Sequence, residues 1–320
     1  MLSRVADSFY WMSRYLERAE HTARLIDVDL QLRLDQASPE AATARWLRLL
    51  EALQIPAFLV GRVDARSFPH TLTFSRSSPS SIASCIAAAR ENLLQVREQC
   101  TSEMWEQLNR LYLQVTEEHV ADTSVLQSYA FFRAVQEGAH LFHGITDSTM
   151  THGEGWLYIQ LGQYVERTDA LATLLIAHFS HLPHLPDQTV EGADHLEWVG
   201  LLKSSTAFEA YCKVYTVELR PRRIAEFLLL NRDFPHSIRF SVERLHAALE
   251  MVGGFTHRSA ELPVRLAGRL RAMLDFSQVD EIMAGGIQSY LDEVRRQCAQ
   301  VHAAIQQIYF DYPVEASMVA

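Results

Sequence analysis

Apolar residues form a regular stripe at the beginning of the chain. Their spacing alternates between four and three residues, which keeps them on one face of a helix with 3.6 residues per turn. The stripe consists of Val5, Phe9, Met12, Leu16, Ala19, Ala23, Ile26 and Leu30. The pattern predicts an amphipathic helix over residues 3–33.

The rest of the chain is dominated by the same helical period. No segment of useful length alternates apolar and polar residues as a half-buried strand would, although residues 60–74 could be extended. Glycine pairs at 253–254 and 285–286 are expected to break helices. Further helices are predicted near 40–54, 80–100, 102–118, 124–148, 155–181, 194–214, 220–230, 236–252, 260–275 and 278–310. The predicted fold class is all-α, a bundle of long helices with short joints.

The helix predicted over residues 155–181 differs from the first one. Its apolar side chains, among them Trp156, Leu161, Leu171 and Phe179, cover nearly the whole circumference. A helix that is apolar all round is a buried one. We therefore expect this segment to run through the middle of the molecule.

A motif of the first helix returns in the second half of the chain. Residues 15–20 read Tyr-Leu-Glu-Arg-Ala-Glu, and residues 164–169 read Tyr-Val-Glu-Arg-Thr-Asp, an offset of 149 residues. A second match follows at an offset of 152, because residues 46–50 and 198–202 both begin with Trp and end with Leu-Leu.

A third match completes a collinear set. Residues 76–82 and 232–238 share the pattern Arg-x-x-Pro-x-Ser-Ile at an offset of 156. A period near 150 is too long for a solenoid repeat, so the matches indicate an internal duplication. Since no Gly/Ser/Pro-rich linker separates the copies, we predict one domain over residues 1–320, with repeats of about 3–150 and 152–310 related by a pseudo-two-fold axis. A functional site is expected where the copies meet.

Composition narrows the choice of partners. The chain has a net charge of −10, which argues against a nucleic-acid partner. Nearly all positive charge is arginine, a planar guanidinium suited to carboxylates and phosphates. The cysteines are scattered, the start shows no signal peptide, and the longest apolar run, 170–177, is too short to span a bilayer. We expect a cytoplasmic protein without a membrane partner.

The repeated Glu-Arg dipeptides place arginines among apolar side chains. Arg18 shares a helix face with Trp11 and Leu25, and Arg167 of the second copy repeats this arrangement. A buried guanidinium must find a carboxylate or a bound anion. The simplest solution is cross-pairing, with Arg18 bound to a carboxylate of the second copy and Arg167 to one of the first.

Two interpretations of these dipeptides stay open. They could be structural ion pairs that lock two long helices in register. Alternatively, they could line a charged pocket on the pseudo-two-fold axis that binds a small polar ligand or the end of a peptide.

The pattern Arg-x-x-Pro-x-Ser-Ile also admits two interpretations. Proline opens a helix, and serine caps its free N–H groups. An arginine beside that positive helix end, Arg76 or Arg232, would complete an anion site that includes Ser237 in the second copy. The alternative is a plain start-of-helix signal.

Other chemistries lack a clear signal. The chain has no glycine-rich phosphate loop, so neither a nucleotide site nor another cofactor is predicted. Three Glu–His pairs have a spacing that could serve a di-metal helical bundle: Glu137 with His140, Glu243 with His246, and Glu17 with His21. They do not recur in the repeat, and the bridging glutamates are missing, so no metal is predicted.

The chain resembles the bacterial alpha-E family, an all-helical domain named for its Glu-Arg motif. The resemblance covers essentially the full chain. It rests on residues 2–7, 10–20, 22–24 and 90–92, Arg97, Trp105, Gly162, Glu166-Arg167, Trp198, Leu201-Leu202, Arg232, Pro235 and Ser237-Ile238. Residues 75–78 depart from the family pattern, which makes Arg76 a weaker anion-site candidate than Arg232.

The resemblance implies a role that the residues alone do not. Members of this family are encoded beside, or fused to, circularly permuted ATP-grasp proteins, which join a carboxylate to an amine through an acyl-phosphate. It therefore implies an accessory or substrate-holding partner of a peptide or amide ligase. The alternatives are a stand-alone enzyme that acts on the peptide product through Glu17 and Glu166, and a di-metal helical enzyme. The ligand-binding candidates are Arg14, Glu17, Arg18, Arg24, Arg76, Glu166, Arg167, Arg232 and Ser237.

Overall fold

The described part of the chain folds into helices. The structure, a computed structural model, describes residues 1–34, 39–55, 68–121, 129–181, 193–255 and 261–310. Within these ranges every regular element is a helix and no strand occurs. The predicted all-α fold class is confirmed.

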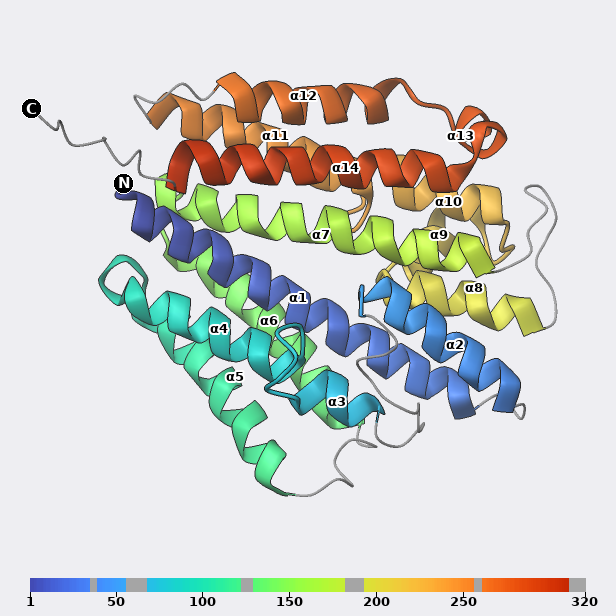
Figure 1. Cartoon of the computed structure of the whole chain (residues 1–320), viewed down its shortest axis with the longest axis horizontal. Coiled ribbons are helices and arrows are strands. Elements are labelled where there is room, and N and C mark those ends of the chain that lie inside the picture. Colours follow the sequence, from blue (N-terminus) through green and yellow to red (C-terminus); the bar gives the residue numbers. More distant parts are fainter. Residues whose placement is uncertain (35–38, 56–67, 122–128, 182–192, 256–260, 311–320) are drawn as a thin grey trace, which may run out of the picture.

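Two long helices run side by side through the middle of the molecule (Figure 1). α1 spans Ser3–Leu34 and α7 spans Glu154–His181. Gly162 of α7 marks a very close approach, since a Cβ atom added there would lie 2.2 Å from the carbonyl oxygen of Tyr10. The absence of a side chain at this position therefore lets the two backbones meet.

Each central helix is covered by helices from its own half of the chain. Two of them pack directly on the central helix, and a third lies on the outside of that pair (Figure 1). On α1 the inner pair is α4 (Ile82–Gln95) and α6 (Tyr129–Thr149), and α5 (Ser102–Ala121) lies outside them. On α7 the inner pair is α11 (Ile238–Phe255) and α14 (Ile287–Ile305), and α12 (Glu261–Phe276) lies outside them.

Two further helices cross from one half of the chain to the other. α2 (Pro39–Ala52) packs on α7, and α8 (Ala193–Ser204) packs on α1. The two halves are therefore interlocked through their second helices. The remaining short elements are α3 (Phe68–Phe74), a 3₁₀ turn (Arg97–Gln99), α9 (Phe208–Tyr215), α10 (Pro221–Leu230), α13 (Val279–Gly285) and a π-helical turn (Gln306–Phe310).

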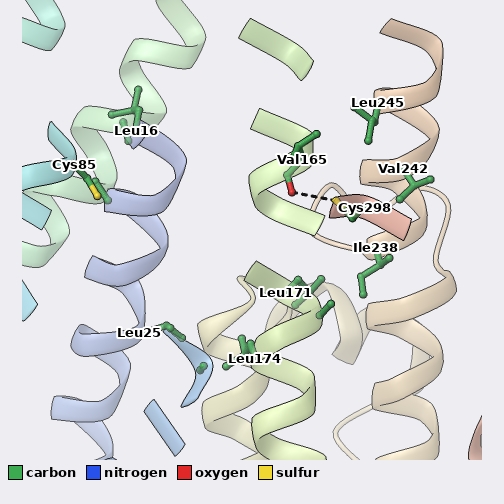
Figure 2. Close-up of a cluster of buried hydrophobic side chains, with 14 of the residues drawn as sticks. Leu16, Leu25, Cys85, Val165, Leu171, Leu174, Ile238, Val242, Leu245 and Cys298 are labelled. Atoms are coloured by element: carbon green, nitrogen blue, oxygen red, sulfur yellow. Dashed lines mark hydrogen bonds between the residues drawn. The ribbon is translucent and has the colours of Figure 1, made fainter. Parts of the chain in front are cut away.

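The predicted burial of the helix over residues 155–181 is confirmed. Val165 and Leu171 of α7 are almost fully buried, and Figure 2 shows Leu171 opposite Ile238 of α11 and Val165 opposite Val242 of the same helix. Cys298 of α14 closes the same region, where its Sγ donates a weak hydrogen bond to the Val165 carbonyl at 3.6 Å. α7 is thus enclosed by neighbours on several sides, as an apolar helix requires.

Two predicted helices are each broken in two. The segment 194–214 divides between α8 and α9 at Thr206, which has a positive φ of 53°, and the Ala207 N–H closes the turn on the Leu202 carbonyl. A threonine rarely adopts this conformation, so the sequence contains no signal for the break. The segment 278–310 divides at Gly286, where φ is +94° and where a glycine break was predicted.

Two other local predictions are wrong. The glycine pair at 253–254 does not break a helix, since α11 continues to Phe255. Residues 68–74 are helical as α3 rather than extended, and residues 60–67 lie outside the described residues.

Helix ends recur at matching positions of the repeated segments. Ser81 Oγ accepts a hydrogen bond from the backbone N–H three residues ahead and donates one to the carbonyl six residues behind. Ser237 Oγ makes the same two bonds with its own neighbours. Gln54 and Thr206, 152 residues apart at the ends of α2 and α8, have φ values of 54° and 53°. These matches support the internal duplication, which stays a prediction.

Candidate functional site

The two Glu-Arg dipeptides form reciprocal ion pairs across the α1–α7 contact. Arg18 donates to Glu166 through Nε, 2.5 Å from Oε1, and through Nη2, 3.0 Å from Oε2. Arg167 donates to Glu17 through Nε, 2.6 Å from Oε1, and through Nη2, 3.0 Å from Oε2. The predicted cross-pairing is confirmed. Both pairs have the bidentate geometry that makes arginine–carboxylate contacts strong and directional.

Glu166 binds a second guanidinium. Arg14 donates to it through Nε at 2.8 Å and lies over the Trp11 ring at 4.8 Å. Burial alone would raise the pKa of Glu166, but the attraction and hydrogen bonds of Arg14 and Arg18 outweigh burial and lower it below its ordinary value. Glu166 is therefore a firmly ionised carboxylate.

The two guanidiniums that cross the interface are shielded from solvent. The Arg167 side chain is 12% exposed and the Arg18 side chain 27% exposed. Burial would lower the pKa of both groups, but the bound carboxylates raise it. Removing one partner of such a pair leaves a buried charge and typically costs about 3–5 kcal/mol. The pairs therefore fix the register of α1 against α7.

A small polar cleft lies beside the Arg167–Glu17 pair. We call it the His21 cleft. Its walls come from α1, α7, the end of α8 and the segment just before α11. The lining residues are Glu17, His21, Arg24, Arg167, Ala170, Leu171, Ser204, Ser205 and His236.

Two neutral imidazoles face this cleft. His21 is only 8% exposed, and its Nε2 has no hydrogen-bond partner among the described residues. Burial, followed by the charge of Arg24, lowers the pKa of His21 to about 4. Burial and then the charges of Arg167 and Arg24 hold the pKa of His236 well below its ordinary value. Both rings are therefore uncharged near neutral pH.

Arg24 connects the cleft to α8. Its Nη1 lies 2.5 Å from Glu20 Oε1, and its Nε donates to the Ser204 carbonyl at 2.9 Å. Burial would raise the pKa of Glu20, but Arg24 and then His140 lower it to about 2. The guanidinium is thus held by one carboxylate and by the end of a helix.

The other predicted site residues lie elsewhere. Arg76 is exposed and lines an open groove with Tyr112, on the outside of the molecule. Arg232 is 62% exposed and lies 3.7 Å from Glu243 and 3.6 Å from Asp275, so two carboxylates already occupy it. Ser237 is fully buried, and its hydroxyl caps α11.

Of the nine predicted candidates, the cleft therefore brings together three, Glu17, Arg24 and Arg167. Neither histidine was among the predicted ligand-binding residues, although His21 was considered, with Glu17, as a metal pair. His21 lies one helical turn after Glu17, and His236 lies inside the second Arg-x-x-Pro-x-Ser-Ile segment. Their positions next to repeated motifs were a usable signal for the cleft.

A second ionic cluster was not predicted. Arg45 and Arg48 of α2 both bind Glu197 of α8, at 2.7 Å and 2.6 Å. The cluster borders a cavity of about 40 Å³ with mostly apolar walls, including Leu25 and Leu174. Arg45 and Glu197 directly precede the repeated tryptophans, which was the available sequence signal.

The residues considered for a di-metal centre do not assemble. Within the parts of the chain that the structure describes, no three His, Cys, Asp or Glu residues are grouped as metal ligands. Glu243 instead contacts Arg239 at 3.3 Å, and His246 contacts Arg271 at 3.1 Å.

Among the helices of the described residues, none is both long enough and apolar enough to cross a bilayer.

Three mycobacterial proteins are similar to this chain. They are one from Mycobacterium bovis and two from strains of Mycobacterium tuberculosis, all described as uncharacterized. Each is 24% identical over 95% of this chain, and the match covers 36% of the relative's own length. The chain thus spans about a third of the length of these relatives. No solved structure matches the chain.

The family comparison agrees with the geometry of the Glu-Arg helices. Residues 1–310 match the alpha-E family, which is described as a predicted alpha-helical domain with a conserved ER motif. Two such dipeptides, Glu17-Arg18 and Glu166-Arg167, form the reciprocal ion pairs at the centre of this all-helical fold. The match covers nearly all of the chain, and the chain therefore belongs to the alpha-E family.

Proposed function

We propose that this protein is an accessory partner of an ATP-grasp-type peptide or amide ligase, and that it holds a carboxylate-bearing or peptide ligand beside its Glu-Arg helices. The observation that carries the proposal is the His21 cleft. It combines two guanidiniums, two imidazoles and serines in a small hollow next to a Glu-Arg ion pair. These side chains are suited to holding a polar ligand.

Activation of a carboxylate needs ATP, and the chain lacks the usual means of binding it. The sequence contains no glycine-rich phosphate loop, and the described residues include no strand that could carry one. In this proposal the phosphoryl chemistry belongs to the ligase, and the alpha-E protein contributes ligand binding.

The relatives provide further support. Roughly two-thirds of the length of each mycobacterial relative lies outside the region that matches this chain. An alpha-E domain that is joined to a larger partner in one protein can act as a separate subunit in another. That the partner is an ATP-grasp ligase comes from the resemblance of the chain to alpha-E proteins in such systems.

The alternative of a stand-alone enzyme is less well supported. A general acid or base needs a pKa near the working pH and access to substrate. Glu166 is buried, binds Arg14 and Arg18, and has a lowered pKa. Glu17 is buried and binds Arg167 through both oxygens. Neither carboxylate is placed to transfer a proton.

Co-purification tests the proposal. The tagged chain would be isolated from its own cells, and the proteins that elute with it identified. The expected result is an ATP-grasp protein at stoichiometric level, while titration calorimetry of the isolated chain with ATP and magnesium gives no binding heat. Tight ATP binding by the chain alone would contradict the proposal.

A further inference from the structure

We propose that the groove between α4 and α5 beside Arg76 is a docking site for a partner protein, and that it takes an acidic side chain whose carboxylate binds Arg76. α4 and α5 lie side by side (Figure 1), and the groove, which we call the Arg76 groove, has a volume of about 330 Å³. It shares no lining residue with the His21 cleft. This docking site is therefore separate from the proposed function and does not depend on it.

The second half of the chain shows what binds an arginine in this position. The offset of 156 residues matches Arg76 to Arg232. Arg232 lies 3.7 Å from Glu243 and 3.6 Å from Asp275. At the same offset Ala87 takes the place of Glu243, and α4 and α11 both begin at the matched isoleucines. The first half therefore lacks the carboxylate that its counterpart supplies from its own helix.

The two halves also differ in the size of the side chains at this place. Ala83 and Ala87 line the groove, and at the offset of 156 residues they correspond to Arg239 and Glu243. In the second half those two side chains contact each other at 3.3 Å along α11. The alanines of the first half leave an apolar surface on which the stem of a glutamate can pack. The volume of the groove is within the range of about 300–1,000 Å³ that is typical of ligand sites.

Arg76 is available to such a carboxylate. In the part of the chain that the structure describes, it has neither an ion pair nor a hydrogen-bond partner, and none of the described residues that line the groove is acidic. The backbone beside it is held in place, because the Ser75 carbonyl accepts hydrogen bonds from the hydroxyls of Ser81 and Ser84 at 2.8 Å and 3.3 Å. Little order has to be gained when a ligand binds, which favours affinity.

A second guanidinium lies at the edge of the groove. Arg90 lies over the ring of Tyr112, which lines the groove, at 4.7 Å and over the ring of Trp105 at 5.2 Å. Its Nε donates to Asn109 Oδ1 at 2.8 Å, so its only printed polar partner is a neutral amide. With a rise of 1.5 Å per residue, Arg90 is about 9 Å along α4 from Ser84. An extended segment covers that length in about three residues, so a second acidic residue of the partner can reach Arg90.

The positive stretch ends beyond this arginine. The next hollow along α5 is lined by Glu106 and Glu117 as well as Trp105. A long polyanion such as a nucleic acid would meet these carboxylates, whereas a short acidic segment would not. The charges therefore fit a partner protein that presents one or two acidic side chains.

The test is a titration of the full chain with the peptide acetyl-Glu-Ala-Val-Glu-amide. The same peptide with glutamines is the uncharged counterpart, and one with phosphoserines is the competing anion. Calorimetry measures the affinity, and the NMR signals of Tyr112 in tyrosine-labelled chain report the location. The variants are Arg76→Ala, Ala87→Glu and the control Arg296→Ala, whose guanidinium is exposed and pairs with Glu293 on its own helix.

We expect the glutamate peptide to bind and to shift the Tyr112 signals, and the other two peptides to bind more weakly. Loss of a hydrogen bond to a charged group corresponds to a weakening of about ten-fold or more in Arg76→Ala. Ala87→Glu should abolish binding, because its carboxylate occupies Arg76 as Glu243 occupies Arg232. It should also raise the urea midpoint relative to the same substitution in the Arg76→Ala background. Arg296→Ala should keep the full affinity.

Three results would overturn the assignment: no binding of the glutamate peptide to the wild-type chain, equal binding of the glutamine peptide or tighter binding of the phosphoserine peptide, or unchanged affinity in Arg76→Ala. Arg76 is exposed and unpaired among the described residues, so its removal should leave the fold intact. If Ala87→Glu does not fold, the Arg76→Ala titration decides alone. The titration needs no ligase, and a negative result therefore leaves the ligase partnership untouched.

Discussion

Arg45 binds Glu197, with its Nη2 2.7 Å from Glu197 Oε1, although the two residues occupy the same place before the repeated tryptophans, Trp46 and Trp198. A residue that contacts its own counterpart lies next to a two-fold axis. The Glu-Arg dipeptides are consistent with the same axis, because a two-fold rotation that exchanges the two copies would convert the Arg18–Glu166 pair into the Arg167–Glu17 pair. A duplicated helical unit that closed on itself would produce both relationships.

The duplication predicts a specific symmetry. In an experimental structure, residues 3–100 should superpose on residues 152–250 by a rotation close to 180°, with matching helices in the same order. A crystal structure of the chain would measure that rotation. A rotation far from two-fold, or a different helix order in the two segments, would contradict the duplication.

Truncation of Arg167 should destabilise the protein strongly. Arg167→Ala leaves the buried Glu17 carboxylate without its bidentate partner, and the expected loss is about 3–5 kcal/mol in the free energy of unfolding. Urea unfolding followed by circular dichroism measures the change. Arg296→Ala is the control, since Arg296 is exposed and pairs with Glu293 on its own helix, and it should change stability by less than about 1 kcal/mol.

A double variant distinguishes the effect of losing the Arg167–Glu17 ion pair from the effect of losing the Arg167 side chain itself. Replacing Glu17 by Gln in the Arg167→Ala background removes the uncompensated charge. The double variant should therefore be more stable than additivity of the two single changes predicts, with a coupling of about 0.5–3 kcal/mol. Additive effects would mean that the two side chains do not interact in solution.

The close approach of α1 and α7 predicts that an alanine substitution destabilises the protein at one glycine and stabilises it at another. Gly162→Ala would place a Cβ atom 2.2 Å from the Tyr10 carbonyl oxygen, and it should cost about 1–3 kcal/mol or more as the helices separate. Gly144→Ala on α6 meets no atom within 4 Å and should stabilise by about 0.5–1 kcal/mol. Thermal unfolding compares both with wild type. Equal effects at the two positions would show that the contact at Gly162 is not formed.

The sequence predicted the fold class and the ionic pairing for physical reasons. Helical periodicity defines elements directly, and Arg18 and Arg167 within apolar seams had to be compensated across the interface. The break at Thr206 could not be predicted, because threonine, unlike glycine, rarely adopts a positive φ. Tertiary packing and a local backbone turn hold it in that conformation here. The position of His236 beside His21 also depends on how α11 packs against α7, which a local pattern does not specify.

Acid should weaken the fold in two stages. The folded-state pKa of His21 is about 4, below its ordinary value of 6.5, so stability is complete above pH 6.5 and falls as pH drops to 4. The slope from this histidine is up to about 1.4 kcal/mol per pH unit. Glu20, with a pKa of about 2 against an ordinary 4.5, adds a loss that begins below pH 4.5 and continues to pH 2.

Urea midpoints measured from pH 8 to pH 4 follow the first stage. His21→Phe should make the dependence between pH 6.5 and 4 shallower without abolishing it, because burial also lowers the pKa of His143, His178 and His302 to about 4. The exposed-site control His152→Phe should leave the dependence as in wild type. A wild-type midpoint that is constant across this interval would show that His21 is not held neutral by the fold.

The proposed function predicts that this alpha-E protein changes the activity of an ATP-grasp ligase. The most direct measurement is the rate at which a purified ATP-grasp ligase from the same organism forms amide product, with increasing amounts of the chain added. We expect the rate to change and to saturate near one chain per ligase, with the His152→Phe control acting as wild type. A rate that is the same with and without the chain, at every ratio, would contradict it.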